Sequence, residues 1–159
     1  MGRWGAAAAT AALLLVACGG DGDDAEVERS VGVYEATLRE VVLVELPASP
    51  DDDLPVVYAM GADGEPIGAQ VQAEVAKRLK DEAEVRFTDR RDDVVDVDET
   101  AEPVVDAEVL VMLGPVAEAG AEVDLDVVLY RSLDDERALV VGLAEQAAAW
   151  SVVSVTPPG

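Results

Sequence analysis

The sequence predicts an α+β fold in which two helices from the N-terminal half pack on one face of a mostly antiparallel sheet of four to five strands. Apolar residues recur at helical spacing in two segments before residue 80, whereas period-two alternation dominates the last third of the chain. Val and Ala dominate the apolar half of the composition, so we expect an aliphatic core. Helices on one side of a sheet are the simplest layering that buries both kinds of apolar face.

The first helix is expected over residues 23–44. Asp23 and Glu26 are placed like a capping pair, and apolar residues follow at helical spacing. Gly32 should weaken this helix by about 1 kcal/mol relative to Ala. Its end is ambiguous, because residues 41–46 could equally form a strand.

The second helix has the strongest pattern in the chain. Pro66 is expected in its first turn, and Glu74 and Arg78 form a favourable i,i+4 pair. Its apolar residues lie four apart on one face: Ile67, Val71, Val75 and Leu79.

Six segments read as strands: 54–60, 84–88, 107–113, 122–131, 137–143 and 147–155. Residues 122–131 alternate most clearly, with valines and leucines on one face and acids on the other. The stretch 94–106 contains Pro103 and has no assignment. Helices followed by a meander that ends in Trp150-Ser151-Val152 resemble the NTF2-like curved sheet over helices, which is therefore one possible topology.

The N-terminus reads as an export signal. An apolar run over residues 5–17 follows Arg3 and is shorter than the roughly 20 residues that span a bilayer. It ends in Leu15-Val16-Ala17-Cys18, which resembles the lipobox of bacterial lipoproteins. The resemblance implies cleavage before Cys18 and a diacylglycerol thioether on its thiol. Ordinary cleavage after Gly19 and an uncleaved short anchor remain alternatives.

We therefore expect a signal peptide over 1–17, lipidated Cys18 with a flexible acidic tether through residue 26, and one globular domain over 27–159. Two acyl chains anchor a protein stably, which predicts lipid anchoring at the extracytoplasmic face of the cell membrane. The chain also resembles small lipoproteins of actinobacteria, a resemblance that carries no functional residue. Cys18 is the only cysteine, so packing alone must hold the domain.

The charge balance is strongly acidic, with 34 Asp and Glu residues against 11 Lys and Arg residues and a formal net charge of −23. Such a surface repels nucleic-acid phosphates and anionic lipid headgroups. We therefore exclude nucleic acid as a partner. A salt-rich habitat would explain the acidity without any ligand.

The absence of His excludes Ser-His-Asp, Cys-His and His-metal sites. No cofactor is expected and no catalytic or metal-binding residue is assigned. Carboxylate chemistry survives, with Glu45 and Glu108 as candidates because each interrupts an apolar run.

A calcium loop is a weaker possibility. Asp96, Asp98 and Thr100 have the alternate spacing of its first ligands, but Ala101 and Ala107 occupy positions that need Gly and Glu. The acidic runs 51–53 and 92–93 could hold cations only loosely.

Basic residues are concentrated against the acidic background: Lys77, Arg78, Lys80, Arg86, Arg90 and Arg91. Arg86, Arg90 and Arg91 are the candidate docking residues for an acidic protein or anionic ligand. Alternatively, these cations complement the end of the second helix or pair with neighbouring acids.

These observations favour a non-catalytic, lipid-anchored extracytoplasmic domain that binds or scaffolds an unknown ligand. One alternative is a carboxylate-dependent hydrolase of cell-wall glycan. The other is a salt-adapted structural surface protein without a ligand.

Overall fold

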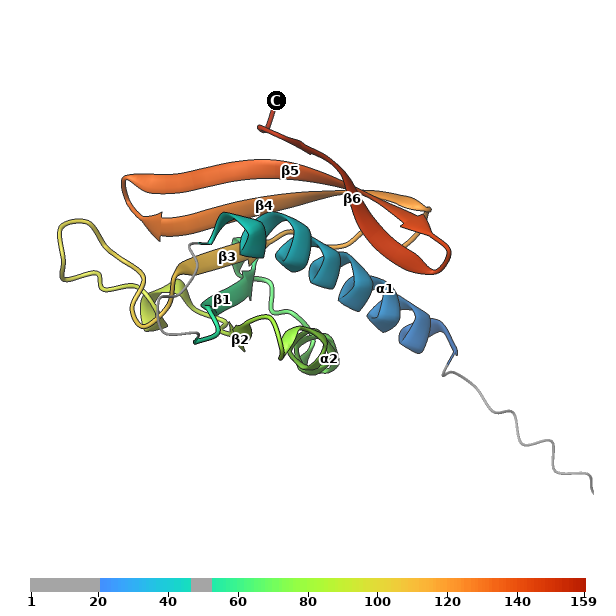
Figure 1. Cartoon of the computed structure of the whole chain (residues 1–159), viewed down its shortest axis with the longest axis horizontal. Helices are drawn as coiled ribbons and strands as arrows, with labels where there is room; N and C mark the ends of the chain where they lie inside the picture. The colour runs from blue at the N-terminus through green and yellow to red at the C-terminus, as the bar shows by residue number, and fades with distance from the viewer. Residues whose placement is uncertain (1–20, 47–52) are drawn as a thin grey trace, which may run out of the picture.

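The computed structural model describes residues 21–46 and 53–159, which form an α+β fold with a six-stranded mixed sheet (Figure 1). The helices and strands follow in the order α1 Asp21–Thr37, β1 Val56–Gly61, α2 Ala69–Leu79, β2 Glu84–Phe87, β3 Val109–Leu113, β4 Glu122–Ser132, β5 Asp135–Gln146 and β6 Ala149–Thr156. Within the described ranges, no helix is both long and apolar enough to cross a bilayer.

The strand order is β2-β1-β3-β4-β5-β6, so the sheet has six strands where four to five were expected. All six strand segments join a single sheet. β1 is parallel to β2 and to β3, and β3 to β6 form an antiparallel meander. The parallel part follows from α2, because parallel neighbours need a crossover connection and α2 supplies it between β1 and β2.

The main core lies between the helices and one face of the sheet (Figure 1). The alternation predicted for β4 is confirmed: four of its apolar side chains are buried in this core, and the acids between them are exposed. Those core residues are Val123, Leu125, Val127 and Leu129.

The unassigned stretch 94–106 covers part of the other face of the sheet. Val94 and Val95 pack with Tyr130 in a second, smaller core. The Tyr130 hydroxyl donates to the Glu102 carbonyl at 2.7 Å, and the Arg91 guanidinium lies 4.1 Å from the centre of the Tyr130 ring. This irregular segment therefore covers the sheet here, where a helix would otherwise be needed.

Helix α1 spans Asp21–Thr37, so it includes residues 21–26 of the expected acidic tether. Acidic residues suit this position, because the N-terminal end of a helix is electropositive. At its other end α1 continues as a π-helical turn over Leu38–Val42 and a 3₁₀ turn over Leu43–Glu45. The strand alternative for 41–46 is therefore wrong.

Helix α2 begins at Ala69, three residues after Pro66, so that proline precedes the first turn. The predicted stripe is confirmed for Val71, Val75 and Leu79, which are buried, whereas Ile67 is buried but precedes the helix. The predicted pair between Glu74 and Arg78 does not form.

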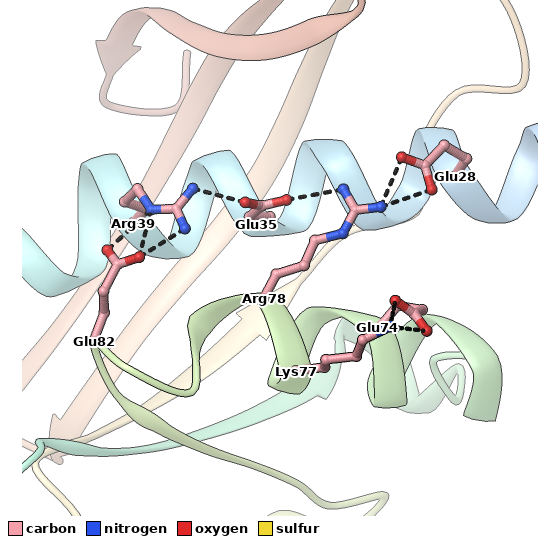
Figure 2. A network of polar contacts seen from close by, with 7 residues as sticks. All are labelled: Glu28, Glu35, Arg39, Glu74, Lys77, Arg78 and Glu82. Atoms are coloured by element: carbon pink, nitrogen blue, oxygen red, sulfur yellow. Dashed lines mark hydrogen bonds and ion pairs between the residues drawn. The ribbon is translucent and has the colours of Figure 1, made fainter.

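Instead, Arg78 reaches across to α1, where it bonds Glu28 at 2.7 Å and Glu35 at 3.1 Å (Figure 2). Glu35 also bonds Arg39 at 2.7 Å, and Arg39 bonds Glu82 just after α2, also at 2.7 Å. We call these five residues the helix ion network. It joins the two helices along their exposed side.

Gly32 lies where α1 packs against β6. A Cβ atom added there would lie 2.6 Å from Cδ1 of Trp150, which is closer than real Cβ contacts. The glycine that weakens the helix thus permits the approach of the indole ring.

We expect Gly32→Ala to destabilise the protein by about 1 kcal/mol, because steric overlap outweighs the gain in helix propensity. In a Trp150→Leu background the same change should stabilise by up to about 1 kcal/mol. Urea denaturation of the four proteins measures the coupling. Stabilisation by Gly32→Ala in both backgrounds would contradict this explanation.

The helix ion network predicts a pH dependence. The hydrogen bonds from Arg39 lower the pKa of Glu82 from its ordinary value of 4.5. Its contribution is therefore fully present above pH 4.5 and is lost as the pH falls through the lower folded-state pKa.

Glu82→Gln should abolish the contribution of this ion pair to the loss of stability at low pH. We expect that contribution to be no more than about 0.5 kcal/mol, because the pair is half exposed. Chemical denaturation at several pH values below 6 measures it. The control is Glu136→Gln, which makes the same charge change at an exposed residue without an ion pair among the described residues. Equal effects of the two changes would count against a specific role for Glu82.

Candidate functional site

A groove of about 940 Å³ runs along α1. Arg29, Gly32 and Ala36 of α1 line it, and the helix ion network borders it on the α2 side. On the other side it is lined by Ala148, Ala149 and Trp150 at the β5–β6 turn. We call this hollow the α1 groove.

Trp150 and Arg29 lie together in the α1 groove. The Arg29 guanidinium lies 4.8 Å from the centre of the indole ring, and its Nε donates to the Ala117 carbonyl at 2.7 Å. Its Nη2 atom is buried and has no hydrogen-bond partner among the described residues. An unpaired buried donor typically costs about 1–3 kcal/mol. Arg29 thus joins α1 to Trp150 and to the β3–β4 connection.

On the side of the groove facing α2, the arginines are already paired with carboxylates. Hydrogen bonds from Arg39 to Glu82 and Glu35 raise the pKa of Arg39 above its ordinary value. Bonds to Glu28 and Glu35 raise the pKa of Arg78 in the same way. These guanidiniums stay charged at all physiological pH values, and their charge is taken up by carboxylates of the network.

The rest of the groove carries a surplus of negative charge. Asp23, Glu26, Glu118 and Glu145 form no ion pair among the described residues, and Glu40 accepts a bond from the Val152 backbone N–H at 3.2 Å. In total the groove is lined by seven carboxylates and three guanidiniums, which leaves a formal charge of −4.

The turn beside the groove is strained. Ala147 and Ala148 have φ angles of 50° and 64°, in the left-handed region that Gly or Asn adopts far more readily. Each such residue typically costs about 1–2 kcal/mol. The wall of the groove is thus held by the pairing of β5 with β6 against a local preference of the chain.

A second hollow, of about 180 Å³, lies where β1 and β3 end beside the N-terminus of α2. Ligands of open α/β sheets bind at such carboxyl ends. Here the Tyr34 hydroxyl donates to the Gly114 carbonyl at 3.0 Å, and burial raises the pKa of Tyr34. The Tyr34 hydroxyl in this hollow is thus already used to join α1 to the residue that follows β3.

The candidate docking arginines do not line the α1 groove. Arg86 pairs with Glu84 at 2.8 Å and lies 5.9 Å from the centre of the Tyr58 ring. Arg91 pairs with Glu102 at 3.5 Å in addition to its stacking on Tyr130.

Arg90 is the most exposed of the three and has only a long contact, 3.9 Å, to Asp92. Lys77, Lys80 and Arg78 are paired as well, at distances of 2.7–3.0 Å. Each member of the basic segment therefore has an acid within 4 Å, and the contact of Arg90 is the longest.

The candidate catalytic carboxylates are engaged in separate structural contacts. Glu108 accepts a bond of 2.6 Å from the backbone N–H of Val56, where β1 begins. Glu45 pairs with Arg137 of β5. The structure therefore ties these two carboxylates to different elements.

The proposed calcium-loop residues form a local turn, in which the Asp98 backbone N–H donates to Asp96 Oδ1 at 3.0 Å. Within 21–46 and 53–159, no group of three or more His, Cys, Asp or Glu side chains is placed to hold a metal ion. Cys18, Asp51 and Asp52 lie outside the described residues.

Sequence reasoning missed the groove and its Trp150, Arg29, Glu118 and Glu145. One signal was present: Ala25, Gly32 and Ala36 lie seven and four residues apart, on one stripe of α1. Small side chains at helical spacing indicate a close approach. The approaching element, β6, could not be identified without the sheet order.

Comparison of the chain with protein-family models, with curated proteins and with solved structures finds no match.

Proposed function

We propose that this protein is a non-catalytic, lipid-anchored extracytoplasmic domain that binds its ligand in the α1 groove. The observation that carries the proposal is the groove itself. At about 940 Å³ its volume is within the range of ligand sites, and its lining combines ten charged residues with Trp150 and small residues. Its walls come from α1 and from the β5–β6 turn, which the core holds in place.

The anchor would hold this groove close to the membrane. Under the lipobox reading, only Gly19 and Gly20 separate Cys18 from the start of α1. The three Cα–Cα steps from Cys18 to Asp21 span at most about 11 Å when fully extended. Since α1 lines the groove along its length, the ligand would be captured near the lipid surface.

Two narrower expectations are kept as proposals. An NTF2-like topology is the finer proposal within the α+β class, and helices on one face of an open sheet are compatible with it. Docking of an acidic protein or anionic ligand at Arg86, Arg90 and Arg91 would draw chiefly on Arg90, whose only ion pair among the described residues is long.

Cys18→Ser should release the protein from the membrane. Loss of the two acyl chains removes the interaction that holds an acidic domain at a lipid surface. Membrane fractionation measures the distribution, and mass spectrometry of the wild-type protein identifies the modification. An unmodified thiol on Cys18, or unchanged partitioning of the variant, would contradict the anchor.

Arg90→Glu should weaken capture of an acidic partner severalfold without a loss of stability, because Arg90 is exposed and weakly paired. Affinity capture from membranes, followed by quantitative mass spectrometry, measures the partners. The control Arg131→Glu reverses a charge that is paired with Asp135 on the β4–β5 hairpin. An identical set of partners for wild type and Arg90→Glu would count against docking at this position.

A further inference from the structure

We infer that the end of the domain nearest Cys18 faces the bilayer that carries the anchor, and that it suits zwitterionic lipid headgroups. This surface consists of the start of α1, residues 21–26, the β3–β4 connection, 114–121, and the β5–β6 turn, 146–149. We call it the anchor pole. The inference rests on the proposed function, in which Cys18 is lipidated, and it adds the face that the membrane covers.

The three segments of the anchor pole are joined to one another. Arg29 Nε donates to the Ala117 carbonyl at 2.7 Å, so the β3–β4 connection lies against α1. The Glu145 backbone N–H donates to the Ala121 carbonyl at 2.8 Å, which joins the same connection to the β5–β6 turn. Figure 1 shows the start of α1 and the β5–β6 turn at one end of the domain and the β4–β5 hairpin turn at the other. The anchor pole is therefore one connected surface.

The length of the chain between Cys18 and the helix keeps this surface near the lipid. Helix α1 rises about 1.5 Å per residue, so Arg29 lies only about 12 Å along it from Asp21. With the short tether, Ala117 stays within roughly 30 Å of Cys18. The 11 residues of β4 then carry the chain about another 35 Å away, to the β4–β5 hairpin turn. That turn reaches the bilayer only when the domain lies on its side.

Charge disfavours the domain lying on its side. A sideways domain would bring the exposed acids of β4, Glu122, Asp124 and Asp126, toward the headgroups. The two loops of the anchor pole are exposed and contain a single charged residue, Glu118, and the segment 146–159 has none. On a chain with a formal charge of −23, these loops are the part that costs least to place beside a lipid surface.

The start of α1 determines which lipid suits this surface. Four of the six residues 21–26 are acidic, and the tether that precedes them is at most about 11 Å long. This length is close to the Debye length of about 8 Å at physiological ionic strength, so the charges of the headgroups act on these acids. Anionic headgroups would repel them, whereas zwitterionic headgroups carry no net charge.

Trp150 follows the β5–β6 turn and supplies the probe. Because Trp4 precedes Cys18, a product of residues 18–159 contains Trp150 as its only tryptophan and Cys18 as its only cysteine. This product would be coupled through Cys18 to a maleimide lipid in phosphatidylcholine vesicles that also contain a dansyl-labelled lipid. We expect efficient energy transfer from Trp150 to the dansyl headgroups.

The matched control couples the same domain through its opposite end. In Cys18→Ser/Asp134→Cys the single thiol lies in the exposed β4–β5 turn, and Cys18→Ser/Leu133→Cys provides a second coupling site in that turn. Energy transfer from Trp150 should be severalfold greater with coupling at Cys18 than with either variant. Equal transfer from both ends would show that the domain lies on its side or pivots freely, and would overturn the inference.

The lipid composition tests the chemistry of the surface. Replacing part of the phosphatidylcholine by phosphatidylserine should lower the transfer seen with coupling at Cys18 when the salt is dilute. Concentrated salt should restore it, because the Debye length falls from about 30 Å at 0.01 M to about 3 Å at 1 M. Transfer that phosphatidylserine leaves unchanged in dilute salt would overturn the preference for zwitterionic headgroups.

Mass spectrometry of the native protein separates this inference from the proposed function. An unmodified thiol on Cys18 would remove the anchor, and the membrane-facing surface with it. A lipidated Cys18 together with equal transfer from the two coupling positions would keep the anchor and overturn only the anchor pole.

Discussion

The close contact between α1 and β6 at Gly32 and Trp150 shapes the α1 groove and fixes how the N-terminal helix meets the sheet. Only a residue without a Cβ atom lets the indole approach to this distance. The contact holds the edge strand of the meander against the N-terminal helix, segments that are more than a hundred residues apart in the chain. The α1 groove runs beside this contact, so its shape depends on the one glycine that local helix propensity would reject.

Charge is distributed unevenly over the fold, in a way that total composition does not reveal. The helix ion network uses Arg39 of the π-helical turn and Arg78 of α2 to pair with Glu28, Glu35 and Glu82 (Figure 2). On the other face of the sheet, Arg86 and Arg91 lie against tyrosines and pair with acids. Nearly all basic side chains are thus paired with acids of the same domain, and the groove keeps a surplus of carboxylates.

The second core explains why an irregular segment is retained in such a small fold. Tyr130 is fully buried, yet its hydroxyl needs an acceptor, which the Glu102 carbonyl provides. That bond, with the Val95–Val104 bridge, closes the loop over the sheet. A regular strand would offer its carbonyls to neighbouring strands, whereas this loop can turn one toward the tyrosine.

Local patterns in the sequence determined the helix and strand segments, because the periods of 3.6 and 2 reflect which side of each element is buried. The stripe of Val71, Val75 and Leu79 and the alternation of β4 were predictable for that reason. Only the tertiary structure decided the parallel pairing of β1, the transfer of Arg78 from Glu74 to α1, and the groove beside Trp150. Each of these depends on contacts between distant segments, and a single sequence carries no periodic signal for such contacts.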